Sequence, residues 1–106
     1  MAFYGNNACH SWAKFSGSGN VSSTVEGHNV SSAADNGEAD YTINFTTSFS
    51  NTDYCQVAGS DNGSSQVRCN CRHTQNTGSY RFKTMTTADS GGANDASNGM
   101  IAFFGK

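Results

Sequence analysis

The chain of 106 residues is long enough for one domain and too short for two. Gly, Ser, Asn and Thr make up nearly half of it and Leu and Pro are absent, which excludes a mainly helical protein and favours short strands joined by polar turns. Six basic against eight acidic residues provide no basic stripe for nucleic acid, and no apolar run approaches the ~20 residues that cross a bilayer, so we expect neither nucleic-acid binding nor membrane insertion.

Residues 1–11 form a short N-terminal arm ahead of the first expected strand. The arm has neither the basic nor the apolar region of a secretory signal, so we expect the protein to be made in the cytoplasm without export through that route. Phe3 and Tyr4 are its aromatic side chains and are candidates for docking onto a partner. A frayed terminus is the alternative interpretation.

Period-2 alternation predicts strands along the rest of the chain. The expected strands are 12–15, 21–25, 30–32, 40–46, 54–58, 66–73, 80–84 and 100–104. The clearest is 40–46, where Tyr41, Ile43 and Phe45 share one face. The turn-forming residues at 35–38 predict a hairpin between this strand and 30–32. Strands spaced in this way indicate a small antiparallel β-sandwich or barrel of about seven to eight short strands, formed by residues 12–106 as a single β-domain.

The last strand is apolar on both faces, which is typical of a central strand or of a strand at a subunit interface. A domain of this size has a thin core, and leftover apolar faces are commonly buried between subunits. Met100, Ile101, Phe103 and Phe104 are therefore candidates for an oligomer interface.

The four cysteines allow three interpretations. If residues 61–63 turn a hairpin, Cys55 lies opposite Cys69 or Cys71, and these three become candidates for a cross-strand disulfide, although a reducing cytoplasm opposes it. Cys69, Cys71 and His73 share one predicted strand face and are weak candidates for a metal site, because zinc prefers wider spacing and a second ligand pair. Small buried hydrophobes are the third interpretation, and we predict no metal and no cofactor.

No residues predict catalysis. Cys9 and His10 are adjacent on an expected strand, so their side chains point to opposite faces and do not form a nucleophile and its base. The acidic residues occur mostly in turn-like segments, where turn chemistry accounts for them. We expect the protein not to be an enzyme.

One part of the sequence is similar to a known family. Trp12, Phe15, Gly17 and Gly19 form a Trp-x-x-Phe-x-Gly-x-Gly pattern, and segments 29–32, 35–37 and 40–47 continue the series. This series resembles a domain found at the C-termini of tail-fibre-like and other structural proteins of bacteriophages, especially marine and cyanobacterial ones. The resemblance covers roughly residues 9 to 105 and is strongest over 12–47.

The resemblance implies a structural protein of the virion, such as a fibre, knob or decoration module involved in host-surface attachment. It implies a homo-oligomer, expected to be a trimer, with other virion proteins and a host-surface glycan as further partners. It implies no catalytic residues, and it places the protein in the virion.

A stand-alone carbohydrate-binding, lectin-like adhesin domain is the alternative function. Sugar recognition uses exposed aromatic rings beside polar side chains, and the surface is expected to be rich in Asn, Ser and Asp. Trp12, Tyr4, Tyr54 and Tyr80 are the candidates for such a stacking platform, although a single Trp more commonly lies in a core or an interface.

Overall fold

The chain folds as two antiparallel sheets packed face to face. The computed structural model describes residues 9–17, 20–61, 68–86 and 97–105, and within them it has eight strands and one helical turn. The elements are β1 (Cys9–Phe15), α1 (Val21–Thr24), β2 (Glu26–His28), β3 (Val30–Gly37), β4 (Asp40–Phe45), β5 (Cys55–Asp61), β6 (Arg68–Gln75), β7 (Ser79–Thr86) and β8 (Asn98–Phe104). The predicted small antiparallel β-sandwich is confirmed.

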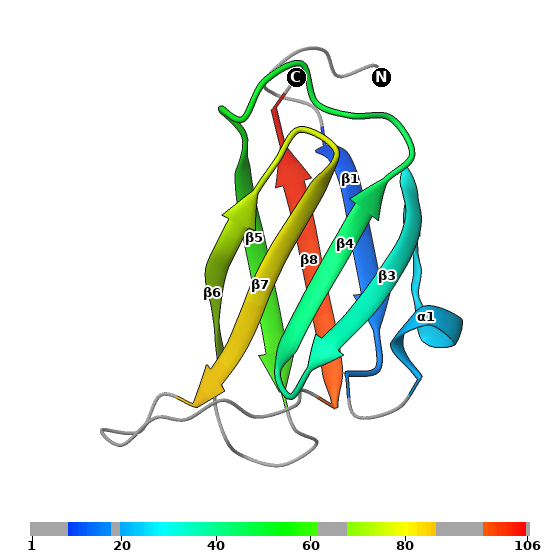
Figure 1. Cartoon of the computed structure of the whole chain (residues 1–106), viewed down its shortest axis with the longest axis vertical. Coiled ribbons are helices and arrows are strands. Elements are labelled where there is room, and N and C mark those ends of the chain that lie inside the picture. The colour runs from blue at the N-terminus through cyan, green and yellow to red at the C-terminus, as the bar shows by residue number, and fades with distance from the viewer. Residues whose placement is uncertain (1–8, 18–19, 62–67, 87–96, 106) are drawn as a thin grey trace.

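Each sheet has four strands. Sheet A has the order β2-β1-β8-β5, and sheet B has the order β3-β4-β7-β6. Figure 1 shows the two layers, with β3, β4 and β7 in front of β1, β8 and β5. In each sheet the two middle strands come from distant parts of the sequence, β1 with β8 and β4 with β7. The outer strands β5 and β6 follow one another in the chain but lie in different sheets.

The β3–β4 hairpin is confirmed, with its turn later than the sequence indicated. β3 continues to Gly37, and the two-residue connection is Glu38 and Ala39, with Ala39 at φ 60°. The register shifts between Asp35 and Gly37, so Asn36 is an extra residue in β3. Because of this bulge, β3 extends as far as Gly37 and the turn falls at Glu38 and Ala39. The Asn36 amide donates hydrogen bonds to Asp40 and Thr42 on β4.

The predicted strand 21–25 is wrong, because Val21–Thr24 forms the single helical turn α1. Asn20 caps this turn: its side-chain oxygen accepts a hydrogen bond from the Ser23 amide at 3.2 Å. Val21 and Val25 both pack toward the core. Residues four apart share one side of a helix and also one side of a strand, so their spacing fits both structures.

Aromatic rings fill the space between the sheets. Tyr41, Ile43 and Phe45 of β4 are buried as the alternation predicted. Phe103 of β8 is fully buried against them, and its ring centroid lies 4.9 Å from Phe45 and 5.2 Å from Tyr80. Such tilted and edge-on ring pairs stabilise a core beyond the area they bury.

Two of the four interface candidates, Ile101 and Phe103, belong instead to this core. They are 3% and 0% exposed, because β8 lies between β1 and β5 in the middle of sheet A and turns alternate side chains toward sheet B. Assigning them to an oligomer interface was therefore wrong. Met100 and Phe104 point to the opposite, outer side of the sheet.

The expected N-terminal arm, residues 1–11, overlaps the first strand of the structure. β1 begins at Cys9, so residues 9–11 are part of a strand and not of the arm. Phe3 and Tyr4 lie outside the described residues. Among the residues that are described, no helix has the length and hydropathy needed to cross a bilayer.

Candidate interaction surface

The outer side of sheet A carries an apolar surface. Directly opposed residues of an antiparallel pair point to the same side, so the register of β1, β8 and β5 defines three rows. The rows are Cys9, Phe104 and Cys55; Trp12, Ala102 and Val57; and Lys14, Met100 and Gly59. We call these nine residues the apolar face. Lys14 is its one charged member.

Large hydrophobic side chains of the apolar face are open to solvent. Trp12 is 44% exposed, Val57 64% and Met100 44%. A shallow groove with a cavity volume of about 500 Å³ runs between Trp12 on β1 and Val57 on β5, over the small residues Ala102 and Gly59. Contiguous exposed apolar surface on a small domain commonly marks a binding or assembly site.

Polar groups border the apolar face along β2. Glu26 lies opposite Lys14, and His28 lies opposite Trp12. β2 has three residues and ends at His28, so its pairing with β1 does not extend to Cys9. The edge of the face therefore has one negative and one positive side chain in register, Glu26 and Lys14, and in the described part of the chain β2 does not extend to the row that contains Cys9.

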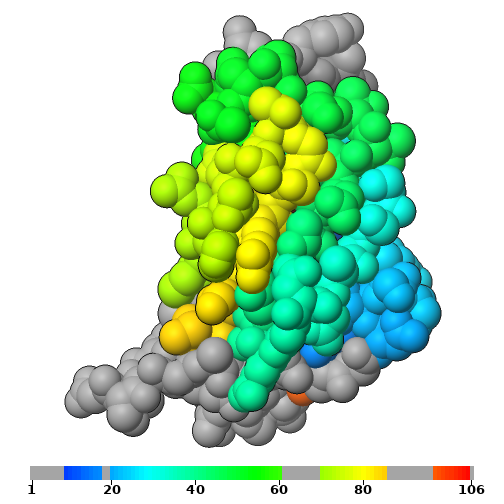
Figure 2. All heavy atoms as spheres, viewed as in Figure 1, coloured from blue at the N-terminus to red at the C-terminus, as the bar shows by residue number. Residues whose placement is uncertain are grey.

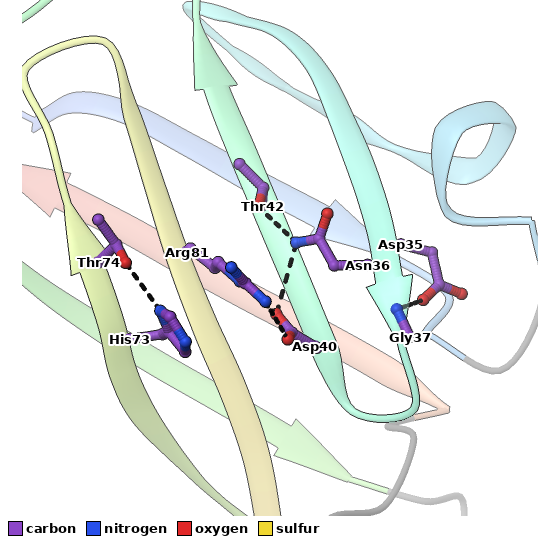
Figure 3. Close-up of polar contacts among 8 residues, drawn as sticks. All are labelled: Asp35, Asn36, Gly37, Asp40, Thr42, His73, Thr74 and Arg81. Carbon is purple, nitrogen blue, oxygen red and sulfur yellow. Dashed lines mark hydrogen bonds and ion pairs between the residues drawn. The ribbon is translucent and has the colours of Figure 1, made fainter.

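The outer side of sheet B, which faces the viewer in Figure 2, carries mainly polar side chains by contrast. The Arg81 guanidinium donates two hydrogen bonds to the Asp40 carboxylate, from Nε at 2.9 Å and from Nη2 at 2.6 Å (Figure 3). Asn36 Nδ2 donates to Thr42 Oγ1 at 2.6 Å and to Asp40 Oδ1 at 3.4 Å. These bonds join β3, β4 and β7, which gives the cluster a structural role.

We expect acid to weaken the fold through Asp40. The Arg81 hydrogen bond, opposed by burial, lowers the pKa of the Asp40 carboxyl from its ordinary 3.8. The unfolded chain then binds a proton near pH 3.8 before the folded chain does, so the stabilisation is present above that pH and is lost as pH falls below it. Urea unfolding from pH 7 to pH 2.5 should show wild type converging on Asp40→Asn at the acidic end. Curves that stay parallel would contradict this role.

The structure separates the cysteines that were expected to pair. β5 pairs with β8 and β6 pairs with β7, so Cys55 lies opposite Phe104 while Cys71 lies opposite Lys83. The hairpin on which that pairing depended does not form, because β5 and β6 belong to different sheets. Cys9, Cys55 and Cys71 are exposed, and the side chain of Cys69 lies outside the described residues.

Two of the three metal candidates on β6, Cys71 and His73, do not keep the alternation that would place them on one strand face. The register shifts between Arg72 and Thr74, so His73 is an extra residue that breaks the alternation with Cys71. The His73 Nδ1 atom lies 2.7 Å from Thr74 Oγ1 (Figure 3). In the part of the chain that the structure describes, no three His, Cys, Asp or Glu side chains are grouped to hold a metal ion.

The aromatic candidates for a sugar platform do not share one surface. Tyr54 and Tyr80 are buried in the core at 7% and 2% exposure, whereas Trp12 is on the apolar face. Burial, with a smaller contribution from Tyr80, raises the pKa of Tyr54 to about 12, and its hydroxyl donates to the Asn76 carbonyl at 2.6 Å. A platform of Trp12 with these two tyrosines is therefore wrong, and Tyr4 lies outside the described residues.

Cys9 and His10 do point apart. Cys9 is on the apolar face, while the half-buried His10 ring stacks on Phe49 with 3.6 Å between ring centroids. Burial lowers the pKa of His10.

No protein-family model matches the chain, and neither a curated protein nor a solved structure matches it. The role of the protein is therefore assigned from its sequence and from the apolar face.

Proposed function

We propose that the protein is a structural module of a bacteriophage particle, a fibre, knob or decoration piece, that assembles with copies of itself through the apolar face. Two observations support this. The segment 12–47 resembles domains of tail-fibre-like phage proteins, and a regular sheet exposes Trp12, Val57 and Met100 on one face. The second observation carries the self-association, because exposing such side chains is unfavourable unless a partner covers them, and the resemblance carries the assignment to a phage particle.

A second copy suits this face better than a charged ligand does. Lys14 and Glu26 lie in register at its border, so their charges cancel and the surface selects neither anions nor cations. The face also has both a projecting indole and a groove over Ala102 and Gly59. Each copy can therefore cover the Trp12 ring of a neighbour, and an aromatic ring of that size buries about 150–250 Å².

The resemblance implies a trimer, with other virion proteins as further partners. Three copies arranged around an axis would each turn the apolar face inward, and the polar outer side of sheet B would face solvent. That arrangement matches the contrast between the two sides of the sandwich.

Mass spectrometry of purified virions, with immunogold labelling, tests the assignment to the particle. We expect this chain to be found in the virions in a fixed ratio to the other structural proteins. Virions that lack the chain would overturn the proposal.

Glycan binding is the second candidate function, favoured by the exposed Trp12 ring. The nearly apolar lining of the groove argues against it, since sugar sites need hydrogen-bonding side chains around the ring. A glycan array tests it: binding that is lost in Trp12→Ala and unaffected by the state of assembly would place a sugar in the groove in preference to a second copy.

A further inference from the structure

Two exposed thiols lie in one row of the apolar face. Cys9 on β1 and Cys55 on β5 are both in register with Phe104 on β8, so they flank this residue on the same outer side of sheet A. Both are open to solvent. Among the described residues, β2 pairs with β1 only from Trp12 to Lys14, so β2 does not reach Cys9.

These two cysteines are too far apart to bond within one copy. They are separated by two strand spacings, about 9.6 Å at about 4.8 Å each. A disulfide needs Cα atoms about 4.4–6.8 Å apart. A disulfide that includes either thiol therefore requires a cysteine from elsewhere, and a neighbouring copy has one at the same height.

The symmetry of assembly determines which thiols meet. When copies turn the apolar face toward an axis parallel to β8, the β1 side of each copy lies next to the β5 side of its neighbour. The axis keeps every row at one height, so Cys9 approaches Cys55 of the next copy. We propose that an intersubunit disulfide between Cys9 and Cys55 closes this ring of copies. The inference rests on the proposed self-association through the apolar face.

The size of the face indicates why a covalent bond matters. The apolar face has three rows about 6.7 Å apart on three strands about 4.8 Å apart, so its area is small. Stable complexes commonly bury about 800 Å² on each partner, so contact through this face alone is expected to be weak. One disulfide at each contact makes the association permanent without enlarging the interface.

Thiol–disulfide exchange with a small-molecule disulfide, such as oxidised glutathione, forms the bond. The Cys9 thiolate attacks one sulfur of the oxidant, forms a mixed disulfide and releases one thiol. The Cys55 thiolate of the neighbouring copy then attacks Cys9 Sγ and releases the second thiol. The oxidant accepts the two electrons that the cysteines lose, and the two protons go to the released thiolates. Such oxidation fits conditions outside the reducing cytoplasm.

Four variants test the pairing in the full chain. The parent variant, Cys69→Ser with Cys71→Ser, keeps only Cys9 and Cys55. Two further variants add Cys9→Ser or Cys55→Ser to it. The matched control keeps only Cys71, which is exposed on the other side of the sandwich, and measures random collision. Each is oxidised with oxidised glutathione and examined by non-reducing gel, mass spectrometry of linked peptides and light scattering.

We expect the parent to give covalent oligomers up to the size measured by light scattering, on the order of tenfold or more faster than the Cys71 control. Each single-cysteine variant alone should stay uncrosslinked, and a mixture of the two should give covalent dimers linked from Cys9 to Cys55. Links from Cys9 to Cys9, or oligomers without any link, would overturn the disulfide alone. A single-subunit mass throughout would overturn the proposed self-association as well.

Discussion

Replacing Phe103 with alanine is expected to lower the free energy of unfolding by about 3–5 kcal/mol. Phe103 is fully buried, and its ring contacts the rings of Phe45 and Tyr80, so removing it leaves a cavity between the sheets. A small domain has a total stability of about 5–15 kcal/mol, so this change removes a large part of it.

Phe104 is the matched control for this prediction. It follows Phe103 in β8 but points to the outer side of sheet A and is only half-buried. Phe104→Ala should cost a small fraction of the Phe103→Ala loss. Urea unfolding followed by Trp12 fluorescence measures both, below the concentration at which copies associate. Equal losses would mean that the two faces of β8 are not as the structure has them.

Replacing Val57 with aspartate is expected to dissociate the assembly while the fold stays intact. Val57 is 64% exposed in the single copy, so the carboxylate remains hydrated there. In the assembly it would be buried on an apolar face without a cation opposite it. An unpaired buried charge costs about 3 kcal/mol or more, which weakens association on the order of 100-fold.

Ser32→Asp is the control for the Val57 variant. Ser32 lies on β3, one of the two edge strands of sheet B, just as Val57 lies on an edge strand of sheet A, and it is exposed on the polar side of the sandwich. Sedimentation velocity of both variants should show wild-type assembly for Ser32→Asp and single copies for Val57→Asp. Assembly that survives Val57→Asp, or that is lost in Ser32→Asp, would exclude the apolar face as the contact.

Local pattern predicted much of the sandwich. The buried set Tyr41, Ile43 and Phe45 follows from alternation, because side chains of a half-buried strand take turns on the two faces. The β3–β4 hairpin follows from the polar turn residues between two such strands. The turn α1 was missed, although Asn20 is a good helix cap and two valines four residues apart also fit a helix.

Strand partnership could not be predicted, and the errors at the site come from it. A hairpin between neighbouring strands would place Cys55 opposite Cys69 or Cys71, whereas β5 pairs with β8 from the end of the chain. The 100–104 run is apolar on both faces, so its pattern could not tell that Ile101 and Phe103 face sheet B. The apolar face exists only because β1 and β5 both flank β8, which is a tertiary feature.

The solution mass of the wild-type chain, measured by light scattering after size exclusion with and without reductant, tests self-association through the apolar face most directly. We predict a mass of several subunits, three for the expected trimer, with reductant shifting the equilibrium toward single copies on dilution. A single-subunit mass at every concentration, with and without reductant, would contradict the assembly.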